Sequence, residues 1–341
     1  MIKVKLCEPD KHRNETAFRP YIWAQNILRD VGIEFTSGDS YDFAWVAQAS
    51  FCDKTLPLEE STDKGLEFLS KISGDYMLLD GQDSTSLVGV YEVFKESNAL
   101  LLLKNSLLKD RSLYKKKFNT GRYYWGEGDY SLNDFDKYCN RIVLSGTNWL
   151  STHWAGIKPQ WYDLNLNKSY DVSAMFSYPS TKENYEYHQR IDVFYDNFRK
   201  PLIDSINNLN CNIAKLDNGI KVSQNEYYNK MFNSKIILAP FGYGEMAPRD
   251  LEAAMFGSVL IKPDMSYIET KPDIFIDNET YISCKHDFSD LNEKIENLLG
   301  DPNKCSYIIQ NLRSKFEEQM NPERLVLHIY DTFKNIKQHK K

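Results

Sequence analysis

The segment 233–264, NSKIILAPFGYGEMAPRDLEAAMFGSVLIKPD, constrains the fold more than any other part of this chain. Residues 236–239 are an apolar run of strand length, and residues 240–245 supply two glycines in a tight turn. Pro248 suits the first turn of a helix, where its missing N–H is not needed, and Gly257 suits a left-handed helix end. The segment therefore predicts a strand, a glycine-rich turn, a helix and a second strand.

Such a unit directs free backbone N–H groups and the positive end of a helix beyond the carboxyl end of its first strand. Open α/β sheets hold phosphorylated ligands at that edge. Arg249 and Glu252 lie one helical turn apart and would stand beside the bound anion. The alternative is an ordinary i,i+3 surface pair, worth a few tenths of a kcal/mol.

These residues also resemble a known family. The pattern Arg249-x-x-Glu252-Ala253-x-x-x-Gly257, between a strand ending in Pro-x-Gly and an apolar strand, is similar to the donor-nucleotide site of GT-B glycosyltransferases. The likeness is to the broad glycosyltransferase group 1 type and to the exostosin-like type. It implies an α/β fold with two Rossmann-like αβα domains facing across a cleft, and a sugar transferase that uses a nucleotide-sugar.

The resemblance also implies roles for single residues. Glu252 would hold the ribose hydroxyls, and the segment 242–249 would lie against the diphosphate. Charge neutralisation is expected from Arg249 together with Lys182 or Arg190, although a solvated helix charge explains the latter two at least as well. The predicted donor-binding residues are therefore Gly242, Tyr243, Gly244, Glu245, Met246, Glu252, Lys182 and Arg190, with Arg249 also catalytic.

An inverting transfer would further need a general base. Asp80 and Asp83 follow a buried strand at its carboxyl end, where catalytic groups of α/β sheets collect. Asp83 is the predicted base, and the alternative is that it caps the helix that follows. A retaining transfer would need no such base, and the sequence leaves the stereochemistry open.

No metal or other cofactor is expected. An Asp-x-Asp pair usually holds the divalent cation of metal-dependent transferases, and here Asp134-x-Asp136 lies in an irregular segment. The six cysteines and six histidines show no metal-like spacing. The scattered cysteines indicate reduced core residues.

The length of 341 residues favours two domains. Strands alternating with helices predict two Rossmann-like domains, over 1–152 and over 169–320. The resemblance implies that the first is the acceptor-side domain and that the second binds the nucleotide-sugar. An aperiodic stretch, 153–168, is the expected linker. Residues 321–341 are expected to form a helix with a basic tail, and the resemblance implies that this helix crosses back to the first domain.

The expected elements of the two domains are as follows. Strands are predicted over 2–6, 41–47, 76–79, 99–103, 141–145, 170–176, 212–216 and 236–239. Helices are predicted over 21–31, 64–72, 87–94, 185–209 and 224–232, and further helices open at Pro302 and Pro322. Residues 113–136, rich in Tyr, Trp and Gly, are expected to be irregular.

The net charge of −6 argues against a nucleic-acid partner. Only residues 334–341 are locally basic, which allows at most peripheral membrane association. No segment reaches the apolar length that spans a bilayer, so a cytoplasmic location is expected.

The function predicted from the sequence is transfer of a sugar, hexosyl or pentosyl, from a UDP- or GDP-linked donor to a hydroxyl of an oligosaccharide or glycan, as in polysaccharide biosynthesis. Two alternatives stay open: a sugar-nucleotide epimerase or hydrolase of the same architecture, and a non-catalytic carbohydrate- or nucleotide-binding module.

Overall fold

The computed structural model describes residues 1–7, 18, 21–22, 24–53, 55–82, 84–145, 162, 167–176, 200–216, 222–242, 244–271, 273–319 and 322–339. The chain divides into two compact units. Unit 1 comprises Met1–Lys158, Ile268–Pro272 and Glu318–Lys341, and unit 2 comprises Pro159–Tyr267 and Asp273–Glu317.

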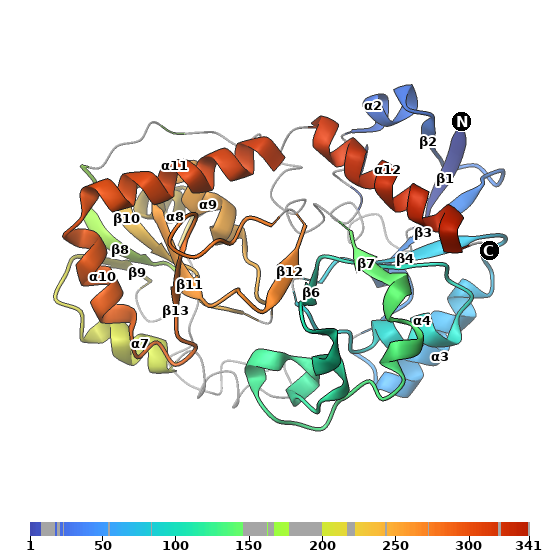
Figure 1. The fold of residues 1–341 in the computed structure, drawn as a ribbon, viewed down its shortest axis with the longest axis horizontal. Helices are drawn as coiled ribbons and strands as arrows, with labels where there is room; N and C mark the ends of the chain where they lie inside the picture. The colour runs from blue at the N-terminus through green and yellow to red at the C-terminus, as the bar shows by residue number, and fades with distance from the viewer. Residues whose placement is uncertain are drawn as a thin grey trace. The chain divides into compact units, whose positions relative to one another are not determined.

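Unit 1 is built on a parallel sheet of six strands (Figure 1). Across the sheet the order is β2 (Ile33–Thr36), β1 (Ile2–Cys7), β3 (Phe43–Ala47), β4 (Tyr76–Asp80), β5 (Leu102–Lys104) and β7 (Ile142–Leu144). The order reverses between β1 and β3, as it does in doubly wound sheets, and ligands of such sheets bind at the point of reversal.

Helices cover both faces of this sheet. Val326 and Ile329 of α12 (Pro322–His339) pack into the same core cluster as Leu28 of α2 (Gln25–Asp30), and Figure 1 shows the two helices together. On the opposite face α3 (Leu58–Leu69) packs against α4 (Val90–Glu96). The C-terminal helix is thus part of the core of unit 1.

Beyond β5 the chain becomes irregular, as predicted. β6 (Ser106–Leu108) pairs antiparallel with β12 (Ile268–Thr270), which comes from a distant part of the chain. The segment that follows holds isolated β-bridges at Phe118 and five short 3₁₀ turns: η2 (Arg111–Lys115), η3 (Asn119–Gly121), η4 (Tyr123–Trp125), η5 (Phe135–Lys137) and η6 (Cys139–Arg141).

Unit 2 has a parallel sheet of five strands. Their order is β13 (Ile282–Cys284), β11 (Val259–Pro263), β10 (Ser234–Leu238), β8 (Tyr170–Ala174) and β9 (Ile213–Lys215). Numbered by their place in the chain, the strands of this sheet run fifth, fourth, third, first, second. The strand order therefore reverses between β8 and β10.

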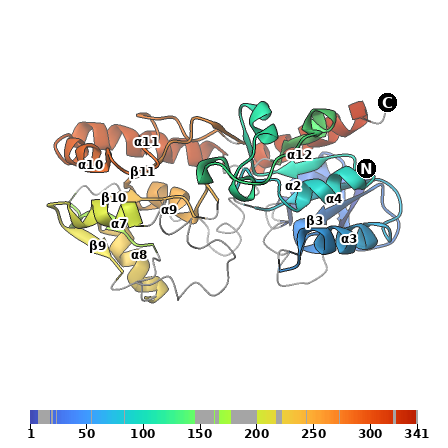
Figure 2. The same cartoon turned by 90° about the horizontal axis from the view of Figure 1, so that it is seen from below.

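The sheet of unit 2 also lies between two helical layers (Figure 2). One layer shares a core cluster with the strands and comprises α7 (Lys200–Asn207), α10 (Leu291–Leu299) and α11 (Pro302–Gln319). The other comprises α8 (Gln224–Phe232) and α9 (Pro248–Phe256), which contact each other and β10. Each unit is therefore an αβα sandwich of the Rossmann-like type, as predicted from the sequence.

The predicted elements differ from the observed ones in places. α4 begins at Val90 rather than at residue 87, because Gly89 adopts φ 82°, which an α-helix cannot continue through. The strand β2 was not predicted; its four residues lie between the predicted helix 21–31 and the predicted strand 41–47. Most of the predicted helix 185–209 and of the linker 153–168 lies outside the described residues; α7 covers Lys200–Asn207.

Candidate functional site

The predicted strand–turn–helix–strand unit is present in unit 2. β10 leads through residues 239–247 into α9, which begins at Pro248 and ends before Gly257. Gly257 adopts φ 62° and ψ 54°, the left-handed conformation predicted for it. The first turn of α9 consequently lies at the carboxyl edge of the sheet, beside the reversal point.

A buried ion pair fixes the turn to the helix. Lys262, on β11, donates from Nζ to Asp250 Oδ2 at 2.7 Å and to the Glu245 carbonyl at 3.0 Å. Asp250 Oδ2 in turn accepts the Ala247 N–H at 2.9 Å. Both side chains of the pair are 0% exposed. One lysine thus joins the glycine-rich turn, the first turn of α9 and the next strand.

Burial sets the electrostatics of this pair. It raises the pKa of the Asp250 carboxyl and lowers the pKa of Lys262, because each charged form loses its hydration. The mutual attraction of the two groups opposes both shifts. Lys262 also lies 4.4 Å from the ring centroid of Phe275, a cation–π distance that favours its charged form. The pair is a structural element of the site rather than an accessible acid or base.

Arg249 is the one predicted catalytic residue that the structure describes. Its Nε and Nη1 atoms are buried and have no hydrogen-bond partner among the described residues. Its guanidinium lies 6.0 Å from the ring centroid of Phe176, which follows β8. The side chain therefore reaches from α9 toward the end of β8, across the reversal point of the sheet. Buried guanidinium donors without partners are costly, and an anion in this place would satisfy them.

Glu252 is more enclosed than a surface pair would be. Its side chain is 3% exposed, and its Oε2 accepts a hydrogen bond from the Tyr227 hydroxyl of α8 at 2.8 Å. Burial and the charge of Glu252 raise the pKa of Tyr227, while the charge of Arg249 lowers it. The three groups thus form one electrostatic cluster. The interpretation of Arg249 and Glu252 as a solvated surface pair is wrong for Glu252.

The remaining predicted donor-binding residues fall into two groups. Gly242 donates from its N–H to the Gly244 carbonyl at 3.0 Å and so closes the turn, and Glu245 and Met246 are 1% and 2% exposed. Tyr243, Lys182 and Arg190 lie outside the described residues. Their assignment to the donor site stays a prediction.

Sequence reasoning missed three side chains at this site. Tyr227 and Lys262 contact predicted residues, and His286 lies 5.5 Å from Phe241, between ring centroids. Burial lowers the pKa of His286. For Lys262 a signal existed: a lysine inside the apolar strand VLIKP has to find a carboxylate partner when buried. For Tyr227 and His286 the sequence held no such signal.

In unit 1 the predicted base Asp83 lies outside the described residues. Asp80 is described and is not accessible. Its Oδ2 accepts from Lys104 Nζ at 2.7 Å, both side chains are 0% exposed, and Lys104 also donates to the Ser84 carbonyl at 2.6 Å. A buried lysine therefore ties the loop after β4 to β5, as Lys262 ties the loop after β10 to β11.

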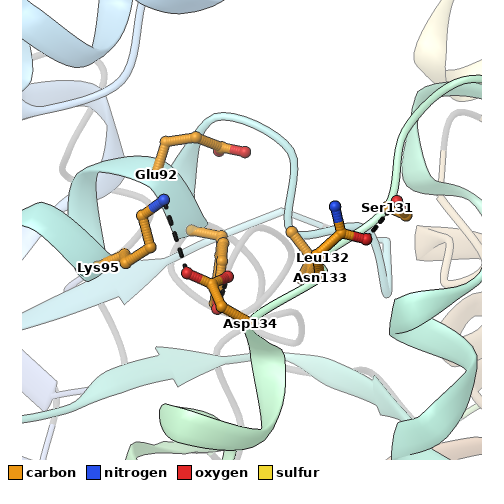
Figure 3. Close-up of a pocket in the computed structure, with 7 residues that line it drawn as sticks. Glu92, Lys95, Ser131, Leu132, Asn133 and Asp134 are labelled. Carbon is orange, nitrogen blue, oxygen red and sulfur yellow. Dashed lines mark hydrogen bonds and ion pairs between the residues drawn. The ribbon is translucent and has the colours of Figure 1, made fainter.

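Unit 1 also contains a cavity of about 340 Å³ between α4 and residues 131–134 (Figure 3). Its polar groups bond to their neighbours. The Tyr91 hydroxyl donates to Asp134 Oδ1 at 2.9 Å, Lys95 Nζ lies 3.8 Å from Asp134 Oδ2, and Glu92 accepts the Gly89 N–H and the Tyr130 hydroxyl. These contacts fasten the irregular segment to α4.

Two further properties concern only the described part of the chain. No three His, Cys, Asp or Glu side chains within it gather closely enough to hold a metal ion. No helix within it combines the length and the apolar character needed to cross a bilayer.

Comparison with known proteins identifies the fold. No protein-family model matches the sequence, and the search of curated proteins gave no match. The structure is similar to sucrose-phosphate synthase from Thermosynechococcus elongatus, with a TM-score of 0.52 at 12% identity over 98% of this chain and 99% of that one. A weaker likeness is to HepE from Anabaena, solved in complex with UDP, with a TM-score of 0.45 at 10% identity over 98% and 100%.

The similarity to sucrose-phosphate synthase extends over both units and confirms the fold predicted from the sequence. The chain has the GT-B fold of two Rossmann-like domains, and its structural neighbours are GT-B glycosyltransferases. At 12% identity the similarity concerns the fold alone.

Proposed function

We propose that this protein is a glycosyltransferase that binds a nucleotide-sugar, UDP- or GDP-linked, at the N-terminus of α9 and transfers the sugar to a hydroxyl of a glycan. The observation that carries the proposal is Arg249, whose buried Nε and Nη1 donors have no partner among the described residues. They lie beside a helix N-terminus at the reversal point of a doubly wound sheet, where phosphorylated ligands bind.

The site offers a different group to each part of a nucleoside diphosphate. The guanidinium of Arg249 and the first-turn N–H groups of α9 suit the diphosphate, whose negative charge grows as the sugar leaves. The carboxylate of Glu252, one turn further along α9, suits two ribose hydroxyls, because a carboxylate accepts more than one hydrogen bond. The Lys262–Asp250 pair holds the turn in place before the ligand arrives.

Charge neutralisation in this proposal comes from the helix, the backbone and Arg249, so the transfer is proposed to be metal-independent. If transfer inverts the anomeric centre, Asp83 is the proposed general base that removes the proton of the acceptor hydroxyl. Lys182 and Arg190 are proposed as further cations for the diphosphate.

The experiment follows donor consumption. Candidate UDP- and GDP-sugars are first ranked by the rise in melting temperature that each causes, since a ligand of the folded state stabilises it. The best donor is then incubated with and without oligosaccharide acceptors, and both nucleoside diphosphate release and conversion of the donor sugar are measured. A transferase releases diphosphate faster with the matching acceptor. Equal conversion without acceptor would instead indicate an epimerase or hydrolase, and no conversion with any donor would indicate a binding module.

A further inference from the structure

Tyr227 donates a hydrogen bond to the Glu252 side chain. The two residues are 25 positions apart, on α8 and α9, and the Tyr227 O–H donates to Glu252 Oε2 at 2.8 Å. Tyr227 is partly buried and Glu252 is 3% exposed. Tyr227 is not among the predicted donor-binding residues. Its hydroxyl contacts one of them, Glu252, and has no role assigned so far.

The hydroxyl is a permanent donor. Burial and the negative charge of Glu252 raise the pKa of Tyr227 above its ordinary value, so the phenol stays protonated throughout the neutral range. A protonated phenol beside a carboxylate can only donate to it, and this fixes the direction of the hydrogen bond. Charge-assisted bonds of this kind are among the stronger ones in proteins.

A hydrogen bond to one carboxylate oxygen restricts the orientation of a glutamate side chain. The terminal torsion of Glu has broad, roughly two-fold preferences, so a hydrogen bond to one of its oxygens narrows the range of orientations of the carboxylate plane. A ribose presents two adjacent hydroxyls in a fixed geometry, and only one orientation of the plane can accept from both. A carboxylate has about four lone-pair sites, so accepting from Tyr227 is compatible with accepting from two ribose hydroxyls.

We propose that Tyr227 is a positioning residue that orients the Glu252 carboxylate to accept from the 2′- and 3′-hydroxyls of the donor ribose, and that it thereby sets the preference for ribonucleotides over 2′-deoxyribonucleotides. This inference rests on the proposed function. It adds that the preference depends on a phenol that does not itself touch the nucleotide.

The test is a calorimetric titration of the full chain with UDP and 2′-deoxy-UDP, or with GDP and 2′-deoxy-GDP if the protein prefers guanine. The measured quantity is the ratio of the two dissociation constants. Tyr227→Phe removes only the hydroxyl. We expect the wild type to prefer the ribonucleotide by about tenfold or more, and the variant to lose about three- to tenfold of that preference.

The adjacent residue supplies a matched control. Tyr228 is also partly buried, and its hydroxyl contacts Gln224 Nε2 at 3.2 Å rather than Glu252. Tyr228→Phe should keep the wild-type ratio, whereas a general loosening of α8 would lower affinity for both nucleotides and leave the ratio unchanged. Tyr227→Leu, which also removes the hydroxyl and leaves Glu252 in place, is a second variant with the same expected loss if Tyr227→Phe does not fold.

The outcomes separate this inference from the proposed function. A wild-type ratio in folded Tyr227→Phe, or an equal loss in Tyr228→Phe, would overturn the role of Tyr227 while the nucleotide site stands. Failure of the wild type to bind UDP and GDP at all would reject the nucleotide site itself, and the role of Tyr227 with it.

Discussion

Lys262 and Asp250 form an ion pair of 2.7 Å in which both side chains are completely buried. The same lysine donates to the Glu245 carbonyl, so the pair links the glycine-rich turn to the first turn of α9. Taking two charges out of water is expensive, and well-packed apolar residues in their place are often at least as stable. We interpret the pair as a device that fixes the donor-site backbone.

The first prediction concerns this pair. Lys262→Met leaves the Asp250 carboxylate buried without its partner, and breaking a buried pair in this way costs about 3–5 kcal/mol. The midpoint of urea unfolding, followed by circular dichroism, should fall accordingly. Removing both charges in Lys262→Met with Asp250→Asn should recover part of the loss.

An exposed ion pair with a similar nitrogen–oxygen distance is the control. Lys71 Nζ lies 2.8 Å from Glu67 Oε1, with both side chains more than half exposed. Because solvent screens such pairs, Lys71→Met should leave the unfolding midpoint unchanged. Equal effects of Lys71→Met and Lys262→Met would contradict the interpretation of the buried pair.

The second prediction concerns the end of α9. Gly257 adopts φ 62°, and a side chain there costs roughly 1–2 kcal/mol, so Gly257→Ala should destabilise the protein by about that amount. Gly300, at the end of α10, has φ −80°, and the nearest atom to an added Cβ is the Glu296 carbonyl oxygen at 3.5 Å. Gly300→Ala should therefore be tolerated. Equal melting temperatures for the two variants would contradict this reasoning.

The sequence predicted the features that depend on local chemistry. Pro248 at the start of α9 and Gly257 at its end follow from the conformations those two residues allow, and the alternation of apolar runs predicted the two Rossmann-like units. α11 and α12 begin at Pro302 and Pro322 as expected.

The sequence could not predict features that depend on contacts between distant residues. The pairing of Glu269 in β12 with Leu107 in β6 joins positions more than 150 residues apart, and the short strands carry no marker of their partner. The Tyr227–Glu252 hydrogen bond depends on how α8 and α9 pack. Gly89 was predicted to lie inside a helix, but it has a positive φ of 82°, so α4 begins only at Val90.

The third prediction concerns metal removal. Since the proposed diphosphate ligands are Arg249, helix N–H groups and further cations, transfer should proceed at an unchanged rate in EDTA. The measurement is the initial rate of diphosphate release after dialysis against chelator, with and without added manganese. A complete loss in chelator that manganese restores would reject the metal-independent mechanism.

The fourth prediction concerns the base. If product analysis shows inversion, Asp83→Asn should lower turnover by about two to four orders of magnitude, the usual contribution of general base catalysis, with donor affinity nearly unchanged. Asp39→Asn, at a carboxylate whose side chain is 100% exposed, is the control and should keep the full rate. A retained anomeric configuration, or full activity in Asp83→Asn, would remove the assignment.

The fifth prediction concerns Arg249. Because its buried Nε and Nη1 have no hydrogen-bond partner among the described residues, Arg249→Met removes two unsatisfied buried donors and should leave the melting temperature without ligand unchanged or raised. The same variant should lose most of the stabilisation that UDP or GDP gives the wild type. The control is Arg29→Met, at an arginine with a 59% exposed side chain that pairs with Glu34.

The most direct test of the donor site is calorimetric titration of UDP and GDP into the wild type and Arg249→Met, combined with initial rates. Losing charge-assisted bonds to the diphosphate should weaken binding of the preferred nucleotide by about one to two orders of magnitude. Turnover should fall further than binding, since the leaving diphosphate gains charge in the transition state. Wild-type affinity and rate in a folded Arg249→Met protein would contradict the placement of the donor at α9.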